Sequence, residues 1–136
     1  MRVAFGSDDE NETTRAVVRA LTEGGHEIVR PEGSPDWPDL GRFVGQAVVD
    51  GRAGFGVVMC WTGTGTAIAA NKVDGVRAAL AWDAWIARGA RQWNDANVLA
   101  MSLKRLAPDV AVEVLQAFLA EPDPDPDEAA AIAKLS

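Results

Sequence analysis

Short apolar runs along this chain alternate with stretches in which apolar residues recur at the spacing of a helix. Each such pair predicts a strand followed by a helix. The runs contain β-branched residues and stop at turn residues, which is typical of buried strands. They predict strands at residues 2–6, 26–30, 55–59, 76–81 and 97–101. Helices are predicted at residues 14–23, 39–50, 66–72, 83–92 and 108–119. This alternation predicts an α/β fold, a doubly wound parallel sheet with helices on both faces.

Length and charge limit the possible functions. At 136 residues the chain is long enough for one domain with a single core. A net charge of −7 argues against a general nucleic-acid binder or a partner of acidic membranes. With one cysteine and one histidine, a disulfide within the chain and a Cys/His zinc site are excluded. A single free thiol fits the reducing cytoplasm, and no apolar run approaches the length of a membrane span.

The chain is expected to divide near residue 120. A spacer of prolines and acids runs from Glu121 to Asp127 and precedes a short alanine-rich helix. We therefore expect an α/β domain over residues 1–120. Residues 121–136 are expected to form an appendage that packs on a partner subunit.

The stretch from Gly54 to Lys72 contains the clearest chemical feature of the chain. A predicted strand leads to Cys60, a loop with Gly63 and Gly65 follows, and an alanine-rich helix begins after it. Backbone N–H groups converge at such a helix start, and the helix dipole adds to their attraction for negative charge. A thiol beside such a helix N-terminus suggests a reaction in which an oxyanion forms next to a nucleophile or base. From the residues alone, Cys60 could instead be a small buried hydrophobe at a strand end.

Ligands of doubly wound sheets bind at the carboxyl ends of the strands. This rule predicts that the turn after the first strand, residues 7–9, meets the loop of residues 60–65. We expect residues 93–95, which precede the fifth strand, to join the same place.

Several motifs together resemble the ribose-5-phosphate isomerase B and galactose-6-phosphate isomerase family. They are Gly6-Ser-Asp8, Asp36-Trp-Pro-Asp39, Cys60-x-Thr-Gly-x-Gly65, Ala69-Ala-Asn-Lys72, Val76-Arg-Ala-Ala-Leu80 and Asn94-Asp-Ala-Asn-Val-Leu99. The resemblance runs in register from Met1 to about Leu119. It implies a Rossmann-like three-layer α/β/α sandwich and a homodimer or tetramer with active sites between subunits. It also implies interconversion of an aldose phosphate and a ketose phosphate through a cis-enediolate, without metal or organic cofactor.

The resemblance also implies roles for individual residues. Cys60 matches the family's catalytic base, and Thr62 matches a hydroxyl close to the sugar oxygens. Asp8 matches a substrate-binding carboxylate, and Asn94 matches a polar ligand to the enediolate oxygens. The remaining implied ligands to these oxygens are the backbone amides of Gly63, Thr64 and Gly65.

Three departures from the family pattern put the substrate in question. Asp9 and Trp93 stand where the family usually has histidines, of which the second helps to open the sugar ring. The C-terminal region, where the family carries phosphate-binding arginines, is acidic here, with Lys134 its only base. Lys104 lies where an arginine is common and could keep one phosphate contact.

Other residues could compensate for these losses. Arg88 and Arg91, on the predicted helix before Trp93, could contact a phosphate or could be ordinary solvated charges. Trp61 and Trp93 could stack on the apolar face of a sugar, whereas core or interface packing is the alternative for both. Trp82 and Trp85 more readily suggest packing.

Three functions follow as hypotheses. The expected one is a sugar-phosphate isomerase with Cys60 as base and an altered substrate, less phosphorylated or already open-chain, with Asp9 as substitute acid or base. The second is a plain ribose-5-phosphate isomerase that tolerates Trp93 because ring opening is partly spontaneous. The third is a non-catalytic paralogue that binds a sugar or an anion.

Overall fold

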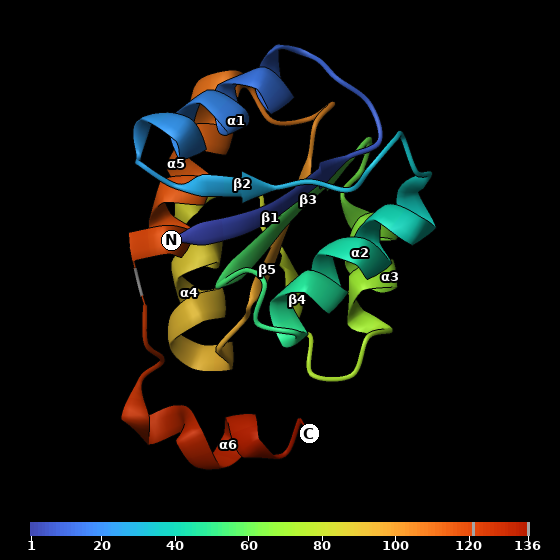
Figure 1. Cartoon of the computed structure of the whole chain (residues 1–136). Helices are drawn as coiled ribbons and strands as arrows, with labels where there is room; N and C mark the ends of the chain where they lie inside the picture. The colour runs from blue at the N-terminus through green and yellow to red at the C-terminus, as the bar shows by residue number, and fades with distance from the viewer. Residues whose placement is uncertain (121, 136) are drawn as a thin grey trace.

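The computed structural model describes residues 1–120 and 122–135, and it contains the predicted parallel sheet (Figure 1). The strand order is β2-β1-β3-β5-β4, and every neighbouring pair is parallel. The strands are β1 (Arg2–Ser7), β2 (Glu27–Val29), β3 (Phe55–Cys60), β4 (Ala78–Leu80) and β5 (Val98–Ser102).

Helices cover both faces of this sheet, so the predicted three-layer α/β/α sandwich is confirmed. The helices are α1 (Glu12–Glu23), α2 (Trp37–Val49), α3 (Thr64–Asn71), α4 (Ala84–Asn94), α5 (Pro108–Ala120) and α6 (Ala129–Ala133), with a 3-10 turn, η1, at Pro126–Glu128. In Figure 1, α1, α4 and α5 lie on one face, and α2 and α3 lie on the other.

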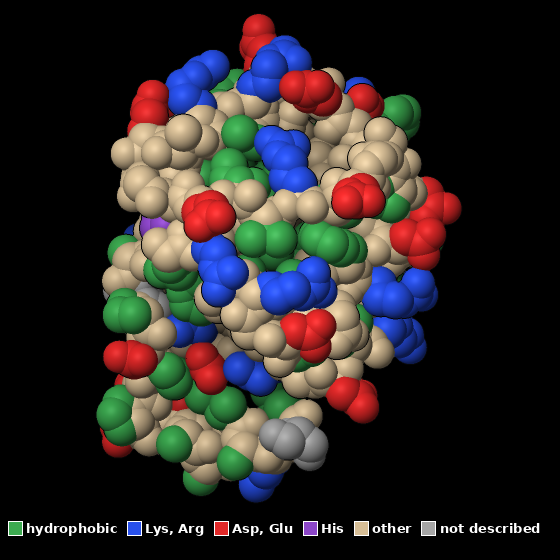
Figure 2. All heavy atoms as spheres, in the orientation of Figure 1, with side chains coloured by type: hydrophobic (Ala, Val, Ile, Leu, Met, Phe, Trp, Pro, Cys, Tyr) green, Lys and Arg blue, Asp and Glu red, His purple; other side chains and the backbone are tan. Residues whose placement is uncertain are grey.

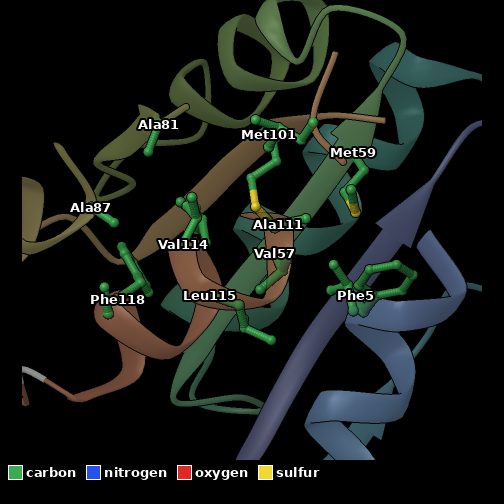
Figure 3. Packing of buried hydrophobic residues seen from close by; sticks show 14 of the residues in the cluster. Phe5, Val57, Met59, Ala81, Ala87, Met101, Ala111, Val114, Leu115 and Phe118 are labelled. Atoms are coloured by element: carbon green, nitrogen blue, oxygen red, sulfur yellow. The ribbon is translucent and has the colours of Figure 1, made fainter. Parts of the chain in front are cut away.

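Alternation along the strands divides the core into two parts. Phe5, Val57 and Met59 lie on the face that α1, α4 and α5 cover, in the same buried cluster as Val114 and Phe118 of α5 (Figure 3). The opposite face carries smaller side chains, because α2 packs closely against the sheet. A Cβ atom on Gly56 would lie 2.5 Å from Val44 of α2, which shows how little room this layer leaves.

The two edge strands are shorter than predicted. The sequence predicts strands at 26–30 and 76–81, whereas β2 and β4 have 3 residues each. Each of them pairs on one side only, with β1 or β5, so the ladder ends where its single neighbour diverges. Apolar composition does not reveal where an edge strand loses its partner.

The C-terminal segment is tied to the end of α4. The backbone N–H of Asp125 donates to the carbonyl of Gln92 at 2.8 Å, and Arg91 donates to the carbonyl of Pro122 at 2.5 Å. Glu121, the first residue of the predicted spacer, lies outside the described residues, as does Ser136. That this segment packs on a partner subunit stays a prediction. Over the described residues, none of the helices combines the length and apolar character that crossing a membrane requires.

Candidate active site

Cys60 is the last residue of β3 and lies at the carboxyl edge of the sheet, as predicted. Its side chain is 5% exposed, and two groups donate hydrogen bonds to its sulfur. The backbone N–H of Gly63 lies 3.2 Å from Sγ, and the hydroxyl of Thr66 lies 3.3 Å from both Sγ and the carbonyl oxygen of Gly63, between which it shares its proton. The sulfur thus accepts hydrogen bonds from the loop and from α3. The alternative of a purely apolar Cys60 does not account for these polar contacts.

Gly63 makes the tight turn between Cys60 and α3 possible. Its φ is 80°, in the left-handed region, and a Cβ atom there would lie 2.6 Å from Leu80 and 2.8 Å from the backbone of Met101. Because of this turn, α3 begins at Thr64 rather than at the predicted Thr66. Consequently the start of the helix, with its outward-directed N–H groups, lies directly beside the cysteine.

The three amides predicted to hold the enediolate oxygen differ in whether they already have a hydrogen-bond partner. The Gly63 amide is directed at Cys60, and the amide of Thr64 donates to Thr62 Oγ1 at 3.3 Å. The hydroxyl oxygens of Thr62 and Thr64 lie 2.6 Å apart on the exposed side of the loop. Gly65, by contrast, is in the first turn of α3, where an amide has no acceptor within the helix.

Trp61 connects the cysteine loop to the turn after β1. Its indole Nε1 donates to Asp9 Oδ2 at 3.2 Å, and the Lys104 Nζ atom lies 4.6 Å from its ring centroid. Its carbonyl accepts a hydrogen bond from Ser102 Oγ at 2.5 Å. The structure therefore brings Asp9, Trp61 and Lys104 together beside Cys60, although the indole is 58% exposed.

The two carboxyls after β1 differ in acidity. Partial burial, and then the charge of Asp9, raise the pKa of Asp8. The backbone N–H of Glu10, the indole of Trp61 and the charge of Lys104 together hold the pKa of Asp9 below its usual value. Neighbouring carboxyls with separated pKa values are a common feature of catalytic sites.

A cleft of about 500 Å³ opens on the other side of this turn. Asp8 and Asp9 line it, together with residues of α1 and of the loop that follows β2. Cys60 does not line this cleft. The volume is within the range of about 300–1,000 Å³ common for small-molecule sites.

The prediction that residues 93–95 join this site is wrong within one chain. Trp93 and Asn94 end α4, and β5 begins after them at Val98, which pairs with Gly56 at the start of β3. Cys60 pairs with Ser102 at the other end, about 13 Å further along the strand. Residues that precede a parallel strand lie at the amino edge of the sheet, opposite the edge that carries Cys60.

Arg91 is a structural residue rather than a substrate contact. It is 1% exposed and donates to Asp95 Oδ1 at 2.9 Å and to the carbonyl of Ala96 at 2.6 Å. Its guanidinium also lies 4.6 Å from the centroid of the Phe55 ring. The idea that it reaches a phosphate from this position is therefore wrong, whereas Arg88 is exposed on α4.

The tryptophans do not pack in the core of the single chain. Trp82, Trp85 and Trp93 are 60%, 63% and 42% exposed, and the rings of Trp85 and Trp93 meet edge to face. Trp85 and Trp93 thus form an exposed aromatic surface on α4.

Two residues of the candidate site are not predicted from the sequence. Thr66 looks like an ordinary helix residue, and only its position one turn into α3 directs its hydroxyl to Cys60. Ser102 holds Trp61 in place across the sheet, and the pairing of β3 with β5 is the signal that could have found it.

Comparison with known proteins gives a consistent result. A family model described as Ribose/Galactose Isomerase matches residues 3–135. Ribose-5-phosphate isomerase B of Escherichia coli is 33% identical over 124 residues, which cover 87% of this chain and 83% of that enzyme. D-erythrulose-4-phosphate isomerase of Pectobacterium atrosepticum is 38% identical over 86 residues. That match covers 63% of this chain and 57% of the relative, so it spans little more than half of the relative's length.

Solved structures agree with this result. The ribose-5-phosphate isomerase B of Clostridium thermocellum superposes with a TM-score of 0.91 at 34% identity, covering 99% of this chain and 95% of that one. The enzyme of the same name from Thermotoga maritima gives 0.89 at 32% identity, covering 98% and 96%. The chain belongs to the ribose/galactose isomerase family.

Proposed function

We propose that this protein is an aldose–ketose isomerase of a phosphorylated sugar, with Cys60 as the catalytic base. The observation that carries the proposal is the pair of donors on Cys60 Sγ, Gly63 and Thr66, beside the first turn of α3. The relatives named above are sugar-phosphate isomerases, which supports the same reaction class here. A free thiol as base requires a reducing compartment, so we place the enzyme in the cytoplasm.

The reaction moves one proton between two carbons. The Cys60 thiolate removes the proton from the carbon beside the substrate carbonyl, and the electron pair moves to the carbonyl oxygen to give a cis-enediolate. The first turn of α3 stabilises this oxygen through its N–H groups and the helix dipole. Return of the proton to the former carbonyl carbon, together with transfer of the neighbouring hydroxyl proton to the enediolate oxygen, gives the isomeric sugar. Thr62, within the loop of residues 60–65, binds a sugar hydroxyl in this scheme.

Asp9 serves better as a base than as an acid in this scheme. Because its pKa is held below the usual range, its carboxylate stays ionised and accepts a proton or a hydrogen bond from a substrate hydroxyl. Asp8 provides a second acceptor in the same turn. Trp61 orients Asp9 and presents an exposed ring on which the sugar can stack.

We also propose that the active site is completed by a second copy of the chain in a homodimer. Trp93 and Asn94 cannot reach Cys60 of their own chain, and the exposed tryptophan surface on α4 offers an apolar face for association. In a two-fold dimer, each subunit would supply Trp93 and Asn94 to the Cys60 of its partner.

Turnover tests the proposal directly. Ribose 5-phosphate, erythrulose 4-phosphate and galactose 6-phosphate are each incubated with the protein, and isomer formation is followed by carbon NMR. The same sugars without phosphate serve as controls. We expect isomerisation of at least one phosphorylated sugar. Thermal stabilisation by these sugars without any turnover would favour the binding paralogue, which gains some support because neither Trp61 nor Trp93 can carry a proton.

Mixing two inactive variants tests the shared site. Cys60→Ala and Asn94→Ala are each expected to have low activity as homodimers, for different reasons. After denaturation and joint refolding, about half of the dimers are mixed, and each mixed dimer has one intact site. Activity should therefore return to about a quarter of the wild-type value. A mixture no more active than its components would contradict a site shared between subunits.

A further inference from the structure

Three arginines line the cleft beside the Asp8–Asp9 turn, and neither the resemblance nor the relatives assign them a role. Arg15 and Arg19 are one helical turn apart on the same side of α1, and Arg30 directly follows β2. Over residues 1–120 and 122–135, none of the three forms an ion pair, whereas Arg42, Arg52, Arg77 and Arg91 each pair with an aspartate. Their positive charge is thus available to a ligand.

Arg30 is held over an apolar floor. Its guanidinium carbon lies 5.0 Å from the centroid of the Phe5 ring, and Phe5 is 1% exposed and also lines the cleft. An apolar surface behind a guanidinium excludes water from one side, which strengthens its attraction for an anion. Figure 2 shows Lys and Arg side chains over the surface where β2 lies between α1 and α2.

The opposite end of the cleft is acidic. Asp8, Asp9 and Glu10 line it, and carboxylates there would repel an anion and accept hydrogen bonds from hydroxyl groups. A ligand that fits both ends therefore carries hydroxyls at one end and an anionic group at the other. A phosphate suits the arginine end best, because guanidinium groups bind phosphate oxygens in pairs.

The acidic end is also the end nearest the cysteine. The backbone N–H of Asp8 donates to the carbonyl of Met59 at 3.3 Å, and Met59 directly precedes Cys60. The turn is also joined to the loop of Cys60 by the hydrogen bond from Trp61 to Asp9, so the acidic end of the cleft adjoins the proposed reaction centre. The chain as a whole carries a net charge of −7, so the protein does not attract anions in general. Binding of phosphate would therefore depend on the three local arginines.

We propose that Arg15, Arg19 and Arg30 bind the phosphate group of a phosphorylated sugar. This assignment rests on the proposed isomerase function. The three arginines would supply the positive charge that the acidic segment after α5 does not offer. A phosphorylated substrate is therefore compatible with that acidic segment.

Calorimetric titration with inorganic phosphate tests the assignment without turnover. The wild-type protein should bind phosphate. Arg30→Gln and Arg15→Gln should each raise the dissociation constant for phosphate about tenfold or more, because each variant loses one charge-assisted contact. Arg30→Lys keeps the charge and should lose less. Circular dichroism confirms that each variant is folded, as expected for exposed side chains.

Arg52→Gln is the matched control, because Arg52 is an exposed arginine in the loop before β3, at the amino edge of the sheet. It should bind phosphate like the wild type. The assignment is overturned if the wild type does not bind phosphate, if the cleft variants bind it unchanged, or if Arg52→Gln loses as much as they do.

Failure of the isomerase proposal can be told apart from failure of this one. If no sugar phosphate is turned over but phosphate binding still depends on Arg15 and Arg30, the isomerase proposal fails and the phosphate assignment stands. If turnover is observed and these variants keep wild-type phosphate affinity and KM, the phosphate assignment fails alone. Cys60→Ala should leave phosphate affinity unchanged.

Discussion

The indole of Trp61 donates a hydrogen bond to the carboxylate of Asp9 across 3.2 Å, joining the loop after β3 to the turn after β1. Two adjacent strands of the sheet thereby present their functional residues as one surface. The contact also helps to lower the pKa of Asp9, after the larger effect of the backbone N–H of Glu10.

Trp61→Phe should raise the pKa of Asp9. The backbone N–H of Glu10, which lowers the pKa most, remains in this variant, and the indole donor is lost. A carboxyl whose pKa is lowered by folding stabilises the protein at pH values above its pKa in the unfolded chain. This contribution disappears as pH falls through its pKa in the folded protein. Carboxyl carbon NMR during a pH titration measures the change. Trp85→Phe, on α4, should leave Asp9 unaffected, and an unchanged pKa in Trp61→Phe would contradict this account.

Asp8→Asn should make the protein more stable at neutral pH. Burial, followed by the charge of Asp9, raises the pKa of Asp8, so wild-type stability falls as pH rises from the ordinary value of 3.8 through the folded one. The variant lacks this ionisation, and its advantage should vanish below that ordinary value. Chemical unfolding at neutral and acidic pH measures the difference, and substrate affinity should fall in the same variant. A variant less stable than the wild type at neutral pH would show that ionised Asp8 does not destabilise the folded protein.

Thr66→Val should reduce kcat/KM by about tenfold, because it keeps the shape of the side chain but removes the hydroxyl that donates to Cys60 Sγ and to the Gly63 carbonyl of the same loop. Thr66 is fully buried, so the stability cost should be about 1 kcal/mol. Thr66→Ser retains the hydroxyl and should stay close to wild type in rate. Steady-state kinetics on the three proteins separates the two roles, and full activity in Thr66→Val would exclude the contribution to catalysis.

Gly63→Ala should destabilise the protein by about 2–5 kcal/mol, since it combines an unfavourable φ with overlap against Leu80 and the backbone of Met101. Gly51 is the control, because its φ is 77° and a Cβ atom there would have no neighbour within 4 Å. Gly51→Ala should cost only about 1 kcal/mol. Urea unfolding at equal protein concentration gives both values. Similar losses in the two variants would mean that packing around Gly63 contributes little.

The sequence predicts the Cys60 region well because its signals are local. An apolar run, a glycine loop and an alanine-rich stretch follow one another directly, and the carboxyl-end rule then brings Asp8 and Asp9 beside them. The same rule misplaces Trp93 and Asn94, because they precede their strand instead of following it. Residues that approach through packing are not visible in a linear pattern. Arg30 and Arg15, on different elements, are recognisable as neighbours only once α1 covers the edge of the sheet.

Deuterium exchange most directly tests Cys60 as the base. In heavy water, the wild-type enzyme should introduce solvent deuterium at the second carbon of its aldose phosphate, as seen by proton NMR. In Cys60→Ala, exchange and isomerisation should both fall by about 10²–10⁴-fold, the usual contribution of a general base. Exchange at the wild-type rate in Cys60→Ala would contradict the proposed mechanism.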